Sequence, residues 1–309
     1  MRRHVIIGAG PIGRGIATLL VANGDRVVLA SRSGVTGAPD GSTGAQVDAT
    51  DAEALSRLAE GADTLVNAVN PASYATWQRD WPPVAAALLS AAEKTGAGLL
   101  TISNLYGYGP VDGVLTEDLP LNAPGTKGRI RAQMWRDALA AHRAGRIRAT
   151  ELRPSDYFGA GVSRHTSMLN EYVIAPTAAG KRVRLVAGHP DVLHSWSYLP
   201  DIAALGAALA TDDRAWGRAW HVPTNEPRTP QQVVDDVAAL TGRPAMKVTR
   251  MPGALMWLAR VVPTVRELDE TAYQFNQPFV LDSSAAQRTF DLAPTPWHNA
   301  LEATVRNVV

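Results

Sequence analysis

Two patterns of apolar and polar residues alternate along the first half of the chain. Short apolar runs, typical of buried strands, are followed by longer segments whose apolar residues lie three or four positions apart, as on one face of a helix. These patterns predict a doubly wound parallel sheet with helices on both faces, an α/β fold. The predicted strands are His4–Gly8, Arg26–Ser31, Ala45–Asp48, Asp63–Val69, Leu99–Ser103 and Ile147–Arg153. The predicted helices are Ile12–Asn23, one that starts at Asp51 with Thr50 as its cap, Tyr74–Thr95, and a basic helix that ends at Arg146.

The pattern changes after Arg153 and Pro154. A helix near Ser167–Gly180, short strands near Arg182–Ala187 and His194–Tyr198, and a helix at Thr229–Gly242 follow, separated by prolines. We therefore predict two lobes with a cleft between them. The sheet domain covers residues 1–153, with parts of the later chain packing back on it. A smaller mixed α/β lobe, residues 154–309, binds the substrate.

The composition excludes several classes of protein. The 309 residues include no cysteine, which excludes disulfides, thiolate catalysis and cysteine-ligated metals. Because the net charge is +1 and no histidine motif has metal-ligand spacing, we expect neither nucleic acid nor a metal as partner. No apolar segment approaches the roughly 20 residues that span a bilayer, and the N-terminus lacks a signal-peptide pattern. We therefore expect a cytoplasmic protein with no membrane partner.

A G-x-G-x-x-G motif, formed by Gly8, Gly10 and Gly13, lies between the first strand and the first helix. Gly8 permits a tight turn, Gly10 lets the backbone approach a pyrophosphate, and Gly13 lets the helix pack closely on the strand. The helix N-terminus, which contains Pro11 and Ile12, supplies amide donors to the phosphates. The alternative is a glycine-rich structural turn. In this strand–turn–helix context the motif predicts dinucleotide binding by a Rossmann-type domain.

The end of the second strand indicates which dinucleotide is bound. An acidic residue there binds the ribose 2′-hydroxyl of NAD, whereas an arginine accommodates the 2′-phosphate of NADP. Here Ser31 and Arg32 end the strand, no carboxylate is present, and Arg14 follows the third glycine. The pattern favours NADP (NADPH), the alternative being two solvated surface arginines. We also expect contacts with the cofactor from Asp48, through the adenine amino group, and from Asn67, Ala68 and Asn70.

With these motifs the chain resembles the extended or atypical short-chain dehydrogenases/reductases, the NAD-dependent epimerase/dehydratase group. The resemblance covers nearly the whole chain and implies that Ser103 polarises a substrate carbonyl. Besides the glycines it rests on Leu100–Ser103 with Leu105-Tyr106-Gly107, Thr116–Pro120, Leu152-Arg153-Pro154 with Tyr157–Gly159, and Tyr198–Ala203.

The catalytic helix departs from the family pattern. The family has Tyr-Gly-x-x-Lys-Ala, in which tyrosine passes the proton and lysine holds the nicotinamide ribose, whereas this chain has Lys127 and Arg131 at those two positions. Both lie on one helix face. Three explanations stay open. Lys127 or Tyr106 supplies the proton while Arg131 holds the ribose; the substrate or a water handles the proton; or catalysis is lost and the cofactor is a structural or sensed ligand.

The second lobe supplies the candidate substrate residues. We expect Tyr157, Asn170, Trp196 and Tyr198 to border the cleft, the alternative being core packing. The resulting hypothesis is an NADP(H)-dependent oxidoreductase or epimerase-like enzyme acting on a small or medium carbonyl, alcohol or sugar-derived substrate; the other is a non-catalytic NADP-binding sensor. A homodimer through the helices at 74–95 and 127–146 and a monomer are both open. Trp81, Trp135 and Trp257 are expected to pack, and His165, His189, His194 and His221 to be structural or pocket-lining.

Overall fold

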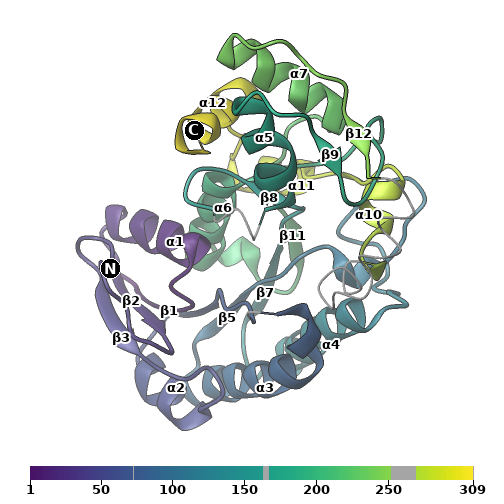
Figure 1. Cartoon of the computed structure of the whole chain (residues 1–309). Coiled ribbons are helices and arrows are strands. Elements are labelled where there is room, and N and C mark those ends of the chain that lie inside the picture. Colours follow the sequence, from purple (N-terminus) through teal and green to yellow (C-terminus); the bar gives the residue numbers. More distant parts are fainter. Residues whose placement is uncertain (72, 163–166, 252–268, 309) are drawn as a thin grey trace.

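A parallel sheet forms the centre of the protein (Figure 1). The computed structural model describes residues 1–71, 73–162, 167–251 and 269–308, and within them the sheet has seven strands in the order β11-β7-β5-β4-β1-β2-β3. This order confirms the doubly wound α/β fold. Its strands are β1 (Arg3–Ile7), β2 (Arg26–Ser31), β3 (Thr43–Gln46), β4 (Thr64–Asn67), β5 (Gly98–Ile102), β7 (Ala149–Arg153) and β11 (Ala219–His221).

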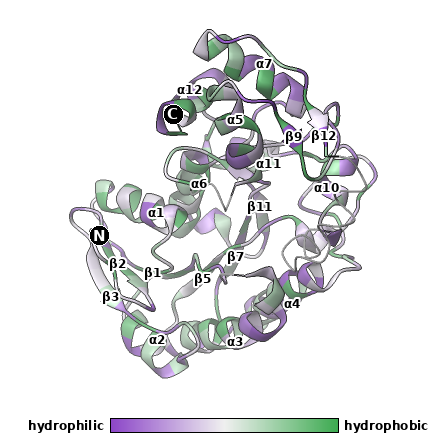
Figure 2. Cartoon of the chain, in the orientation of Figure 1, coloured by the Kyte–Doolittle hydropathy of each residue, from purple (hydrophilic) through white to green (hydrophobic). Residues whose placement is uncertain are grey.

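Helices cover both faces of the sheet, and their apolar sides supply its two cores. Val5 and Ile7 of β1 pack toward one helical layer, whereas Ile6 packs toward the other, as the alternation of a strand requires. Figure 2 shows hydrophobic and hydrophilic positions mixed along the helices, as expected for amphipathic layers. One layer contains α2 (Ala52–Ala59), α3 (Trp77–Thr95) and α4 (Thr126–Arg143); the other contains α1 (Pro11–Ala22), α6 (Leu199–Thr211) and α11 (Ser284–Phe290).

Part of the second half of the chain returns to the sheet. Strand β11 pairs with β7, and α6 packs against α1 so closely that a Cβ on Gly15 would lie 2.8 Å from the Cβ of Ala203. The sheet and its helices thus include residues beyond 153. In the described part of the chain, no helix combines the length and apolar character needed to cross a membrane.

The remaining elements build a smaller lobe, at the top of Figure 1. Its core contains the aromatic residues Phe158, Trp196 and Tyr198. The short strands predicted near Arg182 and His194 pair with β12 and β8, respectively. Its helices are η4 (Asn170–Ile174), α5 (Ala175–Ala178), α7 (Pro230–Thr241), α10 (Tyr273–Asn276) and α12 (Trp297–Val308). Its strand pairs are β8 (Tyr157–Phe158) with β10 (Ser197–Tyr198), and β9 (Arg184–Leu185) with β12 (Thr249–Arg250); β6 (Val114–Leu115) pairs with β13 (Val280–Leu281) nearby.

Two predicted helix starts differ from the structure. Thr50 is not the cap of α2: the Asp51 side chain accepts from the Ala54 amide, while the Thr50 amide and hydroxyl both donate to Asp48. Asp51 is the cap because its carboxylate lies one residue nearer to the backbone amides of the first turn, which have no hydrogen-bond partner within the helix. The predicted helix at Tyr74 begins instead with a 3₁₀ turn, η1 (Tyr74–Thr76), before α3. The predicted packing and pocket roles of Trp257 and His165 lie outside the described residues.

Candidate dinucleotide site and active site

The glycine turn has the geometry that a dinucleotide site needs. Gly8 has φ of +114°, and a Cβ there would lie 2.3 Å from the Ala68 carbonyl oxygen. A Cβ on Gly13 would lie 1.9 Å from the Gly8 carbonyl oxygen, so the helix touches the strand end directly. Gly10, by contrast, is the N-cap of α1 and faces open space, since a Cβ on it would meet no atom within 4 Å. The turn therefore leaves room for a ligand in front of the helix amides.

The two arginines near this turn occupy different environments. The guanidinium of Arg14 already has partners in the protein: it donates to the carbonyl oxygens of Ala9, Thr36 and Gly37. These hydrogen bonds hold the loop after β2 against α1. Arg32, in the turn that follows β2, is exposed, and its charge contributes to the low pKa of Asp48, whose main cause is the hydrogen bonds from Thr50. Of the two predicted phosphate ligands, Arg32 is the one whose side chain extends into solvent.

Further predicted cofactor residues lie at the carboxyl ends of the same strands. The Ser31 hydroxyl donates to the Gly34 carbonyl (2.6 Å). Asn67 ends β4, is buried, and its side-chain oxygen accepts from the Val69 amide (3.2 Å). Ala68 faces Gly8, and Asn70 is exposed just beyond it. The structure thus brings the ends of β1, β2 and β4 together at one edge of the sheet, where ligands bind in open α/β folds.

Lys127 lies in the first turn of α4, where it is 3 % exposed and paired with a residue far away in the sequence. Its Nζ lies 3.2 Å from Glu270 Oε2, and the other oxygen of this carboxylate accepts from the Lys127 amide (2.5 Å). A single carboxylate, that of Glu270, therefore both caps the N-terminus of α4 and forms the ion pair with Lys127. The same Nζ lies over the ring of Tyr74, 5.6 Å from its centroid. Lys127 Nζ thus contacts both a carboxylate and an aromatic ring.

Tyr106 hydrogen-bonds with a second tyrosine. The hydroxyl oxygens of Tyr74 and Tyr106 are 2.8 Å apart, and the backbone around Gly128 comes so close that a Cβ there would lie 2.4 Å from the Tyr106 carbonyl oxygen. Burial raises the pKa of Tyr106 well above its usual value and also raises that of Tyr74. Both phenols are therefore protonated at neutral pH.

Arg131, one helical turn after Lys127, is buried with unmet hydrogen-bond donors. Its guanidinium lies 4.0 Å from the ring centroid of Trp81 and 4.9 Å from that of Trp77, and it is 5 % exposed. Its Nε and Nη1 have no partner in the described protein. Burial lowers the pKa of Arg131 to about 10, while Glu151 opposes the shift, so it remains a cation. Buried donors without partners are costly, and a ligand that accepts from them would relieve that cost.

Ser103 directly follows β5 and belongs to a buried polar chain that the sequence did not predict. Its hydroxyl hydrogen-bonds to the carboxylate of Glu151, whose pKa burial raises. Glu151 pairs with Arg153 at 2.6 Å, and Arg153 donates to the Tyr108 hydroxyl, also at 2.6 Å. The charged pair within the fully buried strand β7 was the signal that could have revealed these contacts.

The last member of this series of buried polar contacts is His221, which contacts Tyr108. Its protonation state follows from its hydrogen-bond partners. Nδ1 lies 2.8 Å from the Asp282 carbonyl oxygen, which only accepts, so Nδ1 carries the proton. Nε2 then accepts from the Tyr108 hydroxyl (2.8 Å). Burial lowers the pKa of His221 to about 4, which agrees with a neutral ring.

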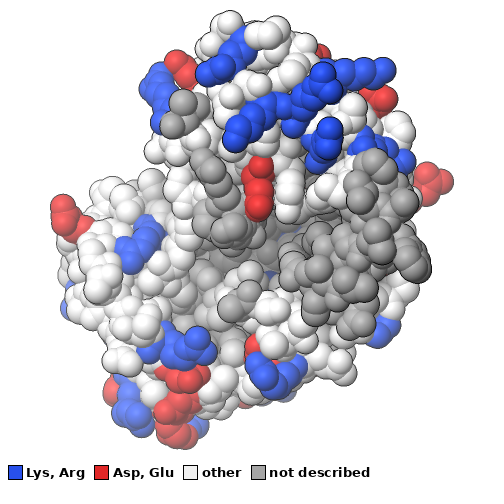
Figure 3. Space-filling view, in the orientation of Figure 1, with Lys and Arg blue, Asp and Glu red and all other residues white. Residues whose placement is uncertain are grey.

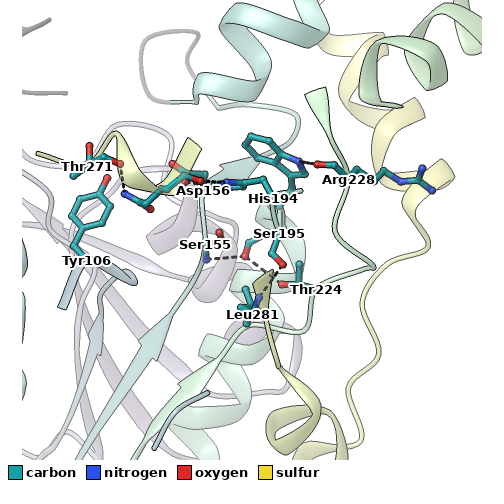
Figure 4. A network of polar contacts seen from close by, with 12 residues as sticks. Tyr106, Ser155, Asp156, His194, Ser195, Thr224, Arg228, Thr271 and Leu281 are labelled. Atoms are coloured by element: carbon teal, nitrogen blue, oxygen red, sulfur yellow. Dashed lines mark hydrogen bonds and ion pairs between the residues drawn. The ribbon is translucent and has the colours of Figure 1, made fainter. Parts of the chain in front are cut away.

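Asp156 and His194 form a second polar pair, beyond the end of β7 (Figure 4). His194 Nε2 lies 3.0 Å from Asp156 Oδ2, and His194 Nδ1 lies 3.0 Å from the Gln274 carbonyl oxygen. In Figure 4 Asp156 lies on the Tyr106 side of His194. Neither Asp156 nor Glu270 was a predicted site residue. Asp156 had a local signal, a carboxylate three residues after the strand end, whereas the contact of Glu270 with α4 is long-range and leaves none.

The predicted substrate residues lie in different surroundings. Tyr157 is half-buried at the start of β8. Trp196 is buried and lines a small apolar cavity of about 30 Å³ with His194 and Phe275, whereas Tyr198 packs on Phe158. Asn170 is fully buried, and its side-chain amide donates to the Gly159 carbonyl (3.0 Å), so in this structure it holds a loop.

The surface is hollowed between the sheet domain and the smaller lobe (Figure 3). Among the residues that the structure describes, no group of three His, Asp or Glu side chains is arranged to hold a metal ion.

Comparison with known proteins identifies the family. The model of the NAD dependent epimerase/dehydratase family matches residues 5–222, and the chain belongs to this family. No curated protein sequence matches the chain.

The similar solved structures share the fold. A protein from Burkholderia cenocepacia J2315 described as an epimerase has a TM-score of 0.79 at 22% identity, covering 99% of this chain and 98% of that one. The dTDP-glucose 4,6-dehydratase of Bacillus anthracis, solved with NAD, has a TM-score of 0.78 at 15% identity, with 99% and 96% covered. The UDP-glucose 4-epimerase of Thermotoga maritima, solved with UDP-glucose, has a TM-score of 0.77 at 16% identity, with 99% and 98% covered.

Proposed function

We propose that the protein is an NADP(H)-dependent oxidoreductase or epimerase-like enzyme with a non-standard active site, acting on a small or medium carbonyl, alcohol or sugar-derived substrate. The observation that carries this proposal is the open space in front of Gly10, at the N-terminus of α1. Relatives of the same fold are described with NAD bound. When bound, a nicotinamide dinucleotide supplies a carbon that accepts or gives a hydride.

The residues at the sheet edge fit such a cofactor. Gly8, Gly10 and Gly13 would hold the pyrophosphate, with the Pro11 and Ile12 turn behind it. Arg131 would hold the nicotinamide ribose, since its Nε and Nη1 have no partner within the described chain. Ser103 would polarise the substrate carbonyl, and Tyr106 or Lys127 would assist the proton.

The preference for NADP rests on Arg32. It is exposed beyond the end of β2, and no carboxylate occupies the position that would bind a ribose 2′-hydroxyl. A charge-assisted hydrogen bond contributes about 1.5–3 kcal/mol, so loss of this arginine should weaken binding of a 2′-phosphate by roughly one to two orders of magnitude.

A pair of fluorescence titrations with NADPH and NADH tests the proposal. We expect NADPH to bind more tightly than NADH, Arg32→Ala to weaken NADPH while leaving NADH within about threefold, and Arg57→Ala, an exposed arginine on α2, to change neither. Equal affinity for both dinucleotides in the wild-type protein would remove the NADP assignment. No binding of either would overturn the function itself.

A non-catalytic NADP sensor is the second candidate, favoured by the ion pair that holds Lys127 to Glu270. The two candidates differ in turnover. In a screen of carbonyl and alcohol substrates, an enzyme should turn over at least one of them, and both Ser103→Ala and Lys127→Ala should slow it while NADPH affinity changes only a few-fold. Binding of NADPH without turnover of any substrate would favour the sensor.

A further inference from the structure

Asp156 lies where a substrate would meet the cofactor, if the proposed function is right. The Ser103 amide donates to the Leu152 carbonyl (2.8 Å), so the ends of β5 and β7 are adjacent, and Asp156 follows Leu152 by four positions. Its side chain is 20 % exposed, so it is accessible without being a free surface group. Its charge also raises the pKa of Tyr74 and Tyr106, after the larger effect of burial, which places it in their neighbourhood.

His194 behind it must donate from both ring nitrogens. The Gln274 carbonyl has no proton to give, so Nδ1 is the donor of that bond. Nε2 faces a side-chain oxygen of Asp156 at 3.0 Å, which accepts when this carboxyl group is ionised. With both ring nitrogens donating to oxygen acceptors, His194 holds Asp156 from one side.

Aromatic rings surround His194. Its ring stacks on Phe275 at 5.0 Å and on Phe279 at 5.2 Å, and lies 4.1 Å from the Trp196 centroid. His194 is 2 % exposed, so these rings shield its contact with Asp156 from water. The Asp156 side chain lies 3.0 Å from Nε2 and forms an ion pair with a protonated ring.

We infer that Asp156, as a carboxylate, is the group that accepts the substrate proton, and that His194, donating to it from Nε2, is a positioning residue that holds this carboxylate in place. In the oxidation of a substrate alcohol, the O–H bond breaks and its proton passes to a carboxylate oxygen of Asp156. A bound NADP⁺ would supply the acceptor for the hydride from the same carbon, so that the overall products would be a carbonyl compound and NADPH. In the reverse direction the protonated Asp156 returns the proton to the forming alcohol.

The other candidates are less suited to this step. Lys127 Nζ is paired with the Glu270 carboxylate at 3.2 Å, and the residue is 3 % exposed. Tyr74 and Tyr106 hydrogen-bond to each other and are protonated at neutral pH. Asp156 has oxygen lone pairs that can accept a proton, and its side chain is partly exposed.

Nitrogen-15 NMR of histidine-labelled protein tests the pair without any substrate. We expect both His194 nitrogens to be protonated at pH 7.5, and Asp156→Asn to leave a neutral ring protonated at Nδ1 alone. Asp191→Asn, which removes an exposed carboxylate beside His189, is the matched control and should leave the His194 signals unchanged. A single protonated nitrogen on His194 in the wild-type protein would overturn the inference.

The kinetic arm uses the alcohol that the screen selects. Asp156→Asn should lower kcat by about 100-fold or more, the usual contribution of a positioned proton acceptor, while NADPH affinity stays within about threefold. Undiminished turnover in this variant would overturn the proton-acceptor role. A protein that binds no dinucleotide would overturn the proposed function instead, and the NMR result would still decide the charge state of the pair.

Discussion

At the scale of single residues, Gly10 and Gly13 belong to one motif but differ in what a methyl group would meet. In Gly10→Ala the added methyl group lies in open space, so the free energy of unfolding should change by less than about 0.5 kcal/mol. The same methyl group should weaken the binding of both NADPH and NADH at least about tenfold. In Gly13→Ala the methyl group clashes with the Gly8 carbonyl oxygen, which should lower the free energy of unfolding by about 1–3 kcal/mol. Urea unfolding and dinucleotide titration separate the two effects. A Gly10→Ala protein with wild-type affinity would contradict the pyrophosphate assignment.

His221 gives a prediction for the pH dependence of stability. Its pKa is about 4 in the folded protein, below the ordinary 6.5, so between these values the unfolded chain binds the extra proton more readily. The contribution of the neutral His221 ring to the free energy of unfolding is fully present above pH 6.5 and is lost as the pH falls toward 4. At pH 5 it has decreased by roughly 2 kcal/mol. The difference in unfolding free energy between pH 7 and pH 5 should therefore shrink by about that amount in His221→Gln. His298→Gln, at an exposed histidine, should keep the wild-type difference.

Residue by residue, local chemistry was readable from the sequence where it depends on neighbours in the chain. The roles of Gly8 and Gly13 follow from backbone geometry within one turn, and the close contacts in the structure are those the motif requires. Glu270 could not be predicted, because its contact with Lys127 spans the whole fold. The Glu151–Arg153 pair was visible as charges in a buried strand, but its partners Ser103 and Tyr108 depend on which strands and loops become neighbours.

At the scale of secondary structure, apolar runs predicted the strands well because each core strand is buried on both faces. The ends were less predictable, as α2 shows, because Thr50 and Asp51 are both good caps and only the backbone decides between them. Strand β11 is too short to have a periodicity of its own, and its pairing with β7 comes from tertiary packing.

The cap assignment on α2 has a direct test. Asp51→Ala should lower the free energy of unfolding by about 1 kcal/mol, because the Ala54 amide loses its acceptor. Thr50→Ala removes only the exposed hydroxyl contact to Asp48 and should cost less than half as much. Chemical denaturation of the two variants beside the wild-type protein gives the comparison. A larger loss from Thr50→Ala would reverse the assignment.

At the scale of the whole molecule, a groove of about 570 Å³ lies between α3 and α4. Leu88 and Leu89 on one helix and Ile130 and Met134 on the other give it an apolar lining. We propose that the same groove of a second copy covers it, since a two-fold contact pairs like with like. Light scattering should then give about twice 32.9 kDa for the wild-type protein.

The control for this dimer uses apolar residues in two places. Met134→Asp should give the monomer mass, while Leu19→Asp, at an exposed leucine on α1, should not. A wild-type protein of monomer mass at micromolar concentration would contradict the dimer.

The cofactor proposal also predicts how the whole fold responds to ligand. The proposed ligand groups come from α1, from the turn after β2, and from α4, so a dinucleotide would contact distant parts of the folded chain and none of them together when it is unfolded. Ligand at 100 times its Kd then stabilises the fold by about 2.7 kcal/mol, which raises the Tm by several degrees.

The size of the Tm shift should depend on the ligand and on the variant. NADPH should give a larger shift than NADH at equal concentration. Arg32→Ala should reduce the NADPH shift alone, and Gly10→Ala should reduce both. Asp156→Asn should leave both shifts unchanged, because its proposed partner is the substrate. A thermal shift that Asp156→Asn abolishes and Gly10→Ala preserves would move the dinucleotide to a different part of the cleft.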